Sequence, residues 1–325
     1  MRIVIPDDYQ DAARQVSSFG KLAGHSVTVY NDTTHDLDAL AHRFSTADAL
    51  LLIRARTRIR DELLARLPHL RLISQTGHAV DHIDVAACSR RGVLVASGGG
   101  DATVPTAELT WGLLLAASRH ITLEAERLRA GRWQTTIGRA LAGRTLGILG
   151  YGRFGRAVAA YGDAFGMSVI VAGGREASRQ SAEASGRRFV TDRREFFAAA
   201  DVLSVHLRLN AATAGSISAG DLAGMKPTAI FVNTSRAELV APGALLAALR
   251  KGTPGFAAVD VFESEPVIRG SDPLLTLDNV VCTPHLGFVE LDTYERYFGA
   301  AIDHIVAFAS GQPTNIVNPE SRVAP

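Results

Sequence analysis

Three glycines in the middle of the chain have the spacing of a dinucleotide-binding loop. Gly150, Gly152 and Gly155 form a G-x-G-x-x-G pattern that follows a short apolar run, residues 145–149, and opens a helix-like stretch. In this setting the first glycine permits a tight turn, the second lets the backbone approach a pyrophosphate, and the third lets helix and strand pack closely. The N–H groups at the start of the helix then face the anion. The pattern predicts a nucleotide site, although a strand-to-helix turn without a ligand could carry the same glycines.

The residues about 20 positions further on bear on which dinucleotide would bind. A site for NAD(H) usually has an acidic residue at the end of the second strand, where it holds the ribose 2′-hydroxyl. Here the strand expected at residues 168–172 ends in Gly173 and Gly174, followed by Arg175 and Glu176. An arginine at this place favours a 2′-phosphate, and hence NADP(H) over NAD(H). Two alternatives stay open: Glu176 could reach the ribose after a shift of one residue, and Arg175 could be a solvated turn residue.

Three further segments follow the glycine loop. They are Asn233-Thr-Ser-Arg236, the stretch from Ala258-Val-Asp260 to Glu265-Pro266, and Cys282-Thr-Pro-His285-Leu-Gly287. In this order and spacing, the four motifs resemble those of the D-isomer-specific 2-hydroxyacid dehydrogenases, and the resemblance covers nearly the whole chain. A single glycine loop is a weak indication, whereas four ordered motifs are far more specific.

The resemblance implies that Arg236, Glu265 and His285 are catalytic. It also implies hydride transfer between a nicotinamide cofactor and a small 2-keto or 2-hydroxy acid. The guanidinium of Arg236 can hold a carboxylate and polarise a keto oxygen through parallel hydrogen bonds. His285 can protonate the developing alkoxide because imidazole gains and loses a proton near neutral pH, and Glu265 would favour the charged ring and orient it. Taken singly, each of the three could equally be a loop or surface residue.

The resemblance implies further binding residues. For the cofactor these are, besides the three glycines and Arg175, the residues Arg153, Phe154, His206, Thr234, Ser235 and Asp260. For the substrate they are Arg54, Gly77, His78 and Ala79, in two loops whose backbone N–H groups would meet the substrate carboxylate. His78, Val80 and Phe288 depart from the usual family pattern on the substrate side, so the particular acid stays open. Arg208 departs from it beside the cofactor. We expect a reductase acting on glyoxylate- or hydroxypyruvate-like keto acids, with a D-2-hydroxy acid as the other member of the pair.

The elements that must hold these residues alternate along the chain. Apolar runs predict strands at 2–5, 26–30, 49–53, 72–75 and 93–96, with helix-like stretches at 9–22, 37–45, 60–66 and 85–90. After Gly98-Gly99-Gly100 we expect one apolar helix up to about residue 129, strands at 145–149, 169–172, 202–206, 229–233, 255–259 and 280–283, and a last helix at 294–310. This alternation predicts an α/β fold with parallel sheets covered by helices.

The length of 325 residues predicts two domains. The resemblance implies that both are doubly wound parallel-sheet domains, with a Rossmann-type cofactor domain at 101–288 inserted into a flavodoxin-like substrate domain made of 1–100 and 289–325. It also implies a homodimer through the cofactor domains, for which the helix at 109–128 would be available.

The composition excludes several other classes of protein. With 34 basic and 33 acidic residues the net charge is +1, so neither a nucleic-acid surface nor a polybasic membrane anchor is expected. No apolar stretch approaches the 18 or so residues of a membrane span. The first eight residues lack the apolar region of a signal peptide, and two cysteines are too few for a disulfide framework, so we expect a cytoplasmic protein.

Two alternatives of other kinds stay open. The fold of this family also serves a transcriptional corepressor, so the chain could be a non-catalytic dinucleotide sensor. His78 and His82 are four residues apart and could share a metal on a helix, but Gly77 opens the segment and no third ligand is evident. We therefore expect no metal.

Overall fold

The computed structural model describes residues 1–174 and 176–321, which form two compact units. The first unit contains residues 1–101 and the chain from Glu290 onward, and the second contains residues 102–289. Arg175, which the sequence suggested for the cofactor phosphate, lies outside the described residues.

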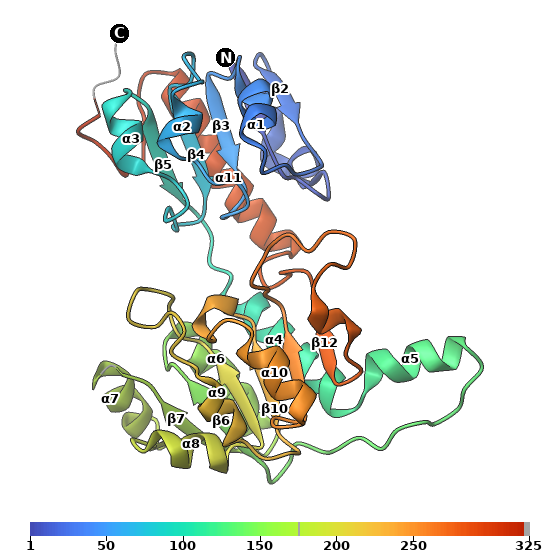
Figure 1. The fold of residues 1–325 in the computed structure, drawn as a ribbon. Coiled ribbons are helices and arrows are strands. Elements are labelled where there is room, and N and C mark those ends of the chain that lie inside the picture. The colour runs from blue at the N-terminus through green and yellow to red at the C-terminus, as the bar shows by residue number, and fades with distance from the viewer. Residues whose placement is uncertain (175, 322–325) are drawn as a thin grey trace. The chain divides into compact units, whose positions relative to one another are not determined.

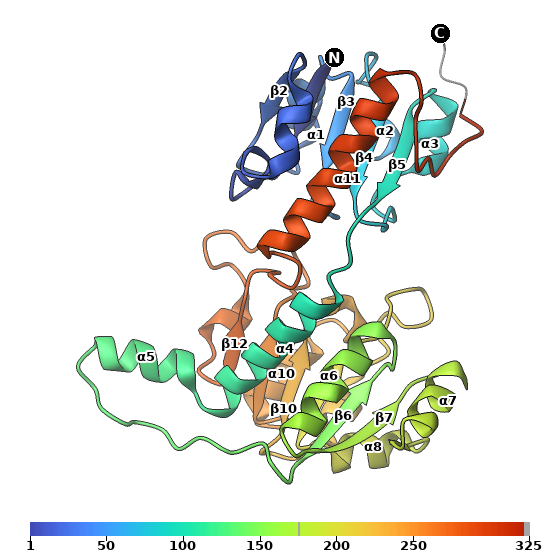
Figure 2. The ribbon, with the colours of Figure 1, turned by 180° about the vertical axis from the view of Figure 1, so that it is seen from behind.

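The first unit is built on a five-stranded parallel sheet. Its strands are β1 (Arg2–Ile5), β2 (Ser26–Val29), β3 (Ala49–Leu52), β4 (Leu72–Thr76) and β5 (Leu94–Gly98). Their order across the sheet is β2-β1-β3-β4-β5, the 2-1-3-4-5 order of flavodoxin-like folds. One face carries α1 (Leu37–Phe44), α2 (Asp61–Leu64) and α3 (Val85–Arg90), and the other carries α11 (Leu291–Ala309), as Figures 1 and 2 show. Because helices cover both faces, β3 and β4 are buried along their whole length, and β3 is an uninterrupted apolar run.

The helix expected at residues 9–22 is wrong. Two short 3₁₀ segments stand there instead, Ala12–Arg14 and Ser17–Leu22. Asp11 has a left-handed backbone (φ 54°), which interrupts a helix. The buried carboxylate of Asp8 accepts hydrogen bonds from the N–H groups of Ala12 (2.9 Å) and Ala13 (2.8 Å) and so replaces the carbonyl partners that a helix would supply.

The end of the described chain returns to the first unit after α11. The N–H of Ser97 donates to the carbonyl of Asn315 (3.1 Å), and the N–H of Val317 donates to that of Val95 (2.8 Å). The amide of the fully buried Asn318 adds bonds to the backbone of Val95 and Val93 (2.8 and 2.9 Å). This segment therefore covers the edge of β5.

The second unit is built on a seven-stranded parallel sheet in the order β12-β11-β10-β9-β6-β7-β8. The strands are β6 (Thr145–Leu149), β7 (Ser168–Ala172), β8 (Arg188–Phe189), β9 (Val202–Val205), β10 (Ile230–Asn233), β11 (Phe256–Val259) and β12 (Val280–Cys282). Counted from β6, this is the 3-2-1-4-5-6 order of Rossmann folds with one strand added. Only β8 was not expected, because two residues carry no periodicity. The predicted fold class, two doubly wound parallel sheets, is confirmed.

Helices cover both faces of this sheet as well. On one face lie α4 (Thr103–Ser118) and α6 (Arg153–Ala164), and on the other lie α8 (Arg193–Ala199), α9 (Ala219–Ala223) and α10 (Ala244–Lys251), as Figures 1 and 2 show. The remaining helix of this region, α7 (Glu176–Ala184), lies beside the β7–β8 edge. Two apolar cores fill the space between the sheet and these layers.

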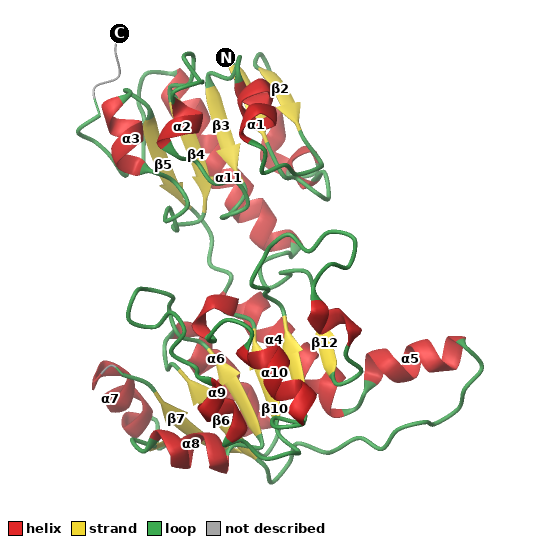
Figure 3. Cartoon of the chain, viewed as in Figure 1, coloured by secondary structure: helices red, strands yellow, loops and turns green. Residues whose placement is uncertain are grey.

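The single long helix expected up to residue 129 is wrong. The helix α4 ends at Ser118, His120 has a left-handed backbone (φ 54°), and α5 (Ile121–Arg129) starts anew. Trp111 and Leu114 of α4 are buried in the core of their own unit, so the helix predicted at 109–128 does not offer one continuous free face. Figure 3 shows α5 and the loop that follows it extending from the body of the unit.

Candidate active site

The motifs of the second unit all follow the ends of strands. The glycine loop follows β6, Asn233 is the last residue of β10, Asp260 follows β11, and Thr283 follows β12. Because the strands are parallel, these segments share the carboxyl edge of the sheet. The strand order reverses between β6 and β9, and ligands of such sheets bind at the carboxyl edge near this point.

The three glycines of the loop have different surroundings. A Cβ on Gly150, whose φ is +98°, would lie 2.8 Å from the carbonyl of His206, and a Cβ on Gly155 would lie 2.1 Å from the carbonyl oxygen of Gly150. At Gly152, by contrast, no described atom lies within 4 Å of such a Cβ. Packing within the protein thus requires glycine at two positions, and the third leaves open space for a ligand. Since α6 begins at Arg153 without a side-chain cap, the residues present fit a pyrophosphate.

The end of β7 lacks the carboxylate that ordinarily selects NAD(H). Gly173 and Gly174 follow Ala172, and Glu176 is the first residue of α7. The carboxylate of Glu176 accepts a long hydrogen bond from Gln180 one turn further on (3.5 Å). This contact therefore lies within its own helix.

His285 and Glu265 form the central pair of the site. His285 Nδ1 lies 2.6 Å from Glu265 Oε2, and each side chain is 32 % exposed. The second oxygen of Glu265 accepts the N–H of Phe262 (3.0 Å). A glutamate on Nδ1 leaves Nε2, the other ring nitrogen, available for a substrate.

Glu265 is held in its charged form. Burial alone would raise the pKa of this carboxyl, but the hydrogen bond and charge of His285 and the charge of Arg236 outweigh burial and lower the pKa below its ordinary value. Glu265 is therefore a carboxylate at neutral pH, and the three residues predicted to act together lie within electrostatic reach of one another.

Arg236 lies in a loop that is held in place by hydrogen bonds between its own residues. The side chain of Asn233 donates to the carbonyl of Arg236 (2.9 Å) and accepts the N–H of Ser235 (3.0 Å). Ser235 Oγ donates to the carbonyl of Leu207 (2.9 Å), which ties this loop to the one after β9. The guanidinium of Arg236 donates to the carbonyl of Ser235 (2.7 Å). The loop is thus held at both its backbone and its arginine head group.

Asp260 holds the loop of His285. This fully buried carboxylate accepts the hydroxyl of Thr283 (2.6 Å) and the N–H groups of Leu286 (2.7 Å) and Gly287 (2.9 Å). Burial raises its pKa against these bonds. His285 between them has a left-handed backbone (φ 54°), a conformation that costs of the order of 1–3 kcal/mol and persists only when its surroundings enforce it. Asp260 was predicted to line the cofactor, and among the described residues the hydrogen-bond partners of its carboxylate are all in the loop of His285.

His206 is neutral in this setting. Its Nε2 lies 2.8 Å from Ser204 Oγ, and burial lowers its pKa to about 4. Any contact of this ring with a cofactor is therefore that of an uncharged imidazole.

A scan of the chain against family models identifies the second unit. Residues 111–287 match the model described as D-isomer specific 2-hydroxyacid dehydrogenase, NAD binding domain. The chain belongs to the D-isomer-specific 2-hydroxyacid dehydrogenase family. Members of this family use NAD(P), and the matched residues include the glycine loop predicted to bind the dinucleotide.

Relatives within the dehydrogenase family cover nearly all of the chain. It is 38 % identical over 293 residues to a glyoxylate reductase of Aeropyrum pernix, a match that covers 87 % of this chain and 86 % of the relative. It is 32 % identical to a glyoxylate/hydroxypyruvate reductase B of Salmonella newport, with 93 % and 94 % covered. Among solved structures, a phosphoglycerate oxidoreductase of Vibrio cholerae shares 51 % identity at a TM-score of 0.92, with 96 % and 99 % covered. The resemblance inferred from the four motifs is confirmed.

The residues predicted to bind the substrate lie in the first unit of this dehydrogenase. The N–H of Gly77 donates to the carbonyl of Gly98 (2.9 Å), so it is engaged within the protein. His78 is exposed and Ala79 half-buried, and their N–H groups make no backbone hydrogen bond among the described residues. The guanidinium of Arg54 lies over the ring of Tyr297, 5.2 Å from its centre. That His78, Ala79 and Arg54 bind the substrate carboxylate stays a prediction.

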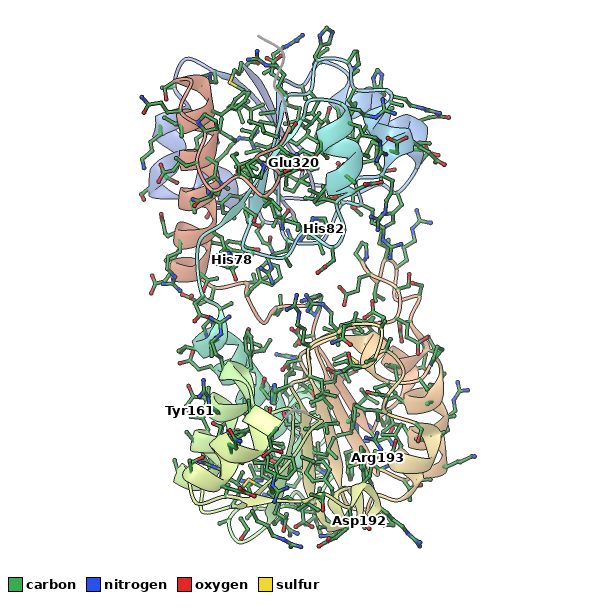
Figure 4. All side chains as sticks on the ribbon, turned by 90° about the vertical axis from the view of Figure 1, so that its left-hand side faces the viewer. His78, His82, Tyr161, Asp192, Arg193 and Glu320 are labelled. Atoms are coloured by element: carbon green, nitrogen blue, oxygen red, sulfur yellow. The ribbon has the colours of Figure 1, made fainter. Side chains whose placement is uncertain are left out.

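The metal alternative involves the same loop. Figure 4 shows His78 and His82 at one end of the first unit. His82 Nε2 lies 3.1 Å from Gln75 Oε1, and burial lowers the pKa of His82 to about 4. Within the described part of the chain, no group of three His, Cys, Asp or Glu side chains could hold a metal ion.

Two residues in contact with the predicted site were missed from the sequence. Thr106 and Thr110 of α4 bond to the loops of His285 and Arg236. Two threonines four residues apart in a largely apolar helix share one face and were the available signal. Phe288, which the sequence marked as a departure from the family pattern, lies with its ring edge-on to His285, with 5.8 Å between the ring centres.

Among the helices that the structure describes, none combines the length and the apolar composition of a membrane span.

Proposed function

We propose that the protein is an NAD(P)H-dependent reductase that converts a small 2-keto acid, of the glyoxylate or hydroxypyruvate kind, into a D-2-hydroxy acid. The observation that carries the proposal is the contact of 2.6 Å between His285 and a charged Glu265, with Arg236 close enough to act on the same carboxylate. The glyoxylate and hydroxypyruvate reductases among the relatives support this substrate class.

Each of the three residues has a distinct part in this proposal. When bound, the nicotinamide supplies the hydride that adds to the keto carbon. Arg236 polarises the keto group as its electron pair moves to the oxygen, because the guanidinium stays charged and donates parallel hydrogen bonds. His285 delivers a proton from Nε2 to that oxygen. Glu265 holds the opposite side of the ring and stabilises its charged form before the proton leaves.

The choice of cofactor is part of the proposal. The two glycines at the end of β7, in place of a carboxylate, favour NADP(H) over NAD(H). The ratio of kcat/KM for NADPH and NADH on one keto acid measures this preference. Arg175→Ala should lower that ratio if Arg175 meets the 2′-phosphate, and an unchanged ratio would exclude this role.

The catalytic test compares His285→Ala with a surface control. Loss of a general acid ordinarily costs about 100-fold or more in turnover, so we expect at least that loss in kcat for glyoxylate or hydroxypyruvate with the melting temperature unchanged. His42→Ala, in α1 of the other unit, should retain full activity. A fully active His285→Ala would contradict the assignment. A wild-type protein that binds NADPH tightly and turns over no keto acid would instead support the sensor alternative.

We propose that the second unit also forms a homodimer, through α5 and the loop that follows. None of the residues of α5 is buried, and the segment exposes several apolar side chains. The exposed fractions are 56 % for Leu128, 76 % for Trp133 and 94 % for Ile137. Large apolar side chains that are exposed along one segment are typical of an interface. Sedimentation should show a dimer that dissociates in Trp133→Ser/Ile137→Asp, and a monomeric wild-type protein would refute this interface.

A further inference from the structure

Two hydroxyls on α4 connect the loop of Arg236 with the loop of His285. Thr106 Oγ1 donates to the carbonyl of Gly287 (2.7 Å), two residues after His285. Thr110 Oγ1 lies 2.6 Å from Thr234 Oγ1, two residues before Arg236. Since positions four apart lie one above the other on a helix, one face of α4 contacts both loops.

The directions of these bonds follow from the number of protons available. Thr110 Oγ1 donates its single proton to the carbonyl of Thr106 (2.7 Å). At the contact with Thr234, Thr110 is therefore the acceptor and Thr234 is the donor. Thr234 is 8 % exposed and Thr110 is 1 % exposed, so removal of either hydroxyl would leave a buried partner unsatisfied.

The loop of His285 is held from two sides at Gly287. Its carbonyl accepts from Thr106, and its N–H donates to Asp260 (2.9 Å). A Cβ on Gly287 would lie 3.2 Å from both Thr106 Oγ1 and Thr106 Cγ2, and 3.3 Å from Asp260 Oδ2. The loop is clamped between α4 and the end of β11.

We propose that Thr106 and Thr110 are positioning residues that set the placement of His285 and Arg236 relative to each other. Neither touches the reacting atoms. Thr106 acts on His285 through the backbone of Gly287. Thr110 acts on Arg236 through Thr234, which belongs to the loop that the side chain of Asn233 holds by its two hydrogen bonds. The inference rests on the proposed reductase function.

The two threonines should affect different kinetic constants. His285 acts only as the proton is transferred, so Thr106→Val should lower kcat about tenfold and change KM for the keto acid less than twofold. Arg236 also binds the ground-state acid, so Thr110→Val should raise KM for the keto acid as well as lower kcat. Serine at either position keeps the hydroxyl and should restore most of the wild-type values.

The test combines kinetics with hydrogen exchange on the full chain. Thr106→Val should speed exchange of the backbone N–H groups in segment 285–288 about fivefold or more, and Thr110→Val should do so in segment 233–236. Ser118→Ala is the matched control, because the one hydrogen bond that this α4 hydroxyl makes within the described residues is to the carbonyl of Leu115 in the same helix (3.1 Å). It should leave both segments and both kinetic constants unchanged.

The outcomes separate this inference from the function on which it rests. Wild-type turnover of a keto acid with unchanged kcat and KM in both valine variants would overturn the positioning role. The same holds if both variants lose activity only in proportion to unfolded protein, or if serine fails to restore it. A wild-type protein without turnover on any keto acid would refute the proposed function itself, and altered exchange in the valine variants would then still report whether the two hydroxyls hold the loops.

Discussion

Replacing Glu265 by Gln should slow keto-acid reduction. Glutamine can still accept the proton on Nδ1 of His285, so the ring keeps its orientation while the negative charge is lost. The attraction between the carboxylate and the proton-donating ring is thereby removed. Because reduction consumes a proton that this ring delivers, kcat/KM for the keto acid should fall at a fixed pH.

The size of the loss follows from the distance between the two side chains. His285 and Glu265 are 2.6 Å apart and each is 32 % exposed, so the dielectric constant of water is the cautious choice. Coulomb's law then gives about 1.6 kcal/mol for the lost attraction, which corresponds to a loss of about 15-fold in kcat/KM. Added salt should reduce the difference between the wild type and the variant, because exposed charges are screened.

The assay is the initial rate of NADPH oxidation with glyoxylate or hydroxypyruvate at one fixed pH, for the wild type, Glu265→Gln and Glu263→Gln. Glu263 lies in the same loop, and its carboxylate accepts the N–H of Gly243 (2.8 Å), so its variant removes a nearby charge outside the pair. An unchanged kcat/KM in Glu265→Gln would refute the reasoning. So would an equal loss in Glu263→Gln, since the effect would then come from net charge rather than from the contact.

Three further predictions follow, two on the glycine loop and one on a buried histidine. Gly155→Ala should lower the stability of the fold by about 1–3 kcal/mol, seen as a lower melting temperature, because its Cβ would lie 2.1 Å from the carbonyl oxygen of Gly150. Gly152→Ala should keep the melting temperature and weaken NADPH binding measured by fluorescence, and a normal affinity would exclude this site for the pyrophosphate. Burial, helped by the charge of Arg54, lowers the pKa of His82 to about 4, below its value of about 6.5 in the unfolded chain. The free energy of unfolding is thus unaffected by His82 above about pH 6.5. It decreases as the pH falls from there to about 4, by about 3 kcal/mol in all, because only the unfolded chain then binds the proton. An NMR titration of the ring checks this, and a midpoint near 6.5 would contradict it.

Much of the fold was visible in local patterns. The apolar runs at 2–5 and 145–149 are strands as expected, and the glycine loop joins a strand to a helix as its spacing predicts. These features depend on neighbours in the chain. A strand buried on both faces needs a continuous apolar run, and a tight strand-to-helix turn needs glycine wherever it occurs.

The interruptions of helices were not visible in the same way. The helix predicted at 9–22 is lost because the carboxylate of Asp8 takes the N–H groups of Ala12 and Ala13. The long apolar helix breaks at His120, whose left-handed backbone no periodicity indicates. In both places a specific local bond or backbone conformation prevails over the average preference of the segment.

The sequence by itself determined which residues are available for chemistry, through four ordered motifs and the elements that carry them. Only the tertiary structure decided which of these residues meet. Glu265 and His285 are 20 positions apart, and they come into contact because β11 and β12 are neighbours in the sheet and their following loops leave the same edge. Thr106 and Gly287 are 181 positions apart in the chain. Thr106 reaches the loop of His285 because α4 packs on the face of that sheet. Contacts of this kind depend on strand order and helix placement, which a local pattern does not contain.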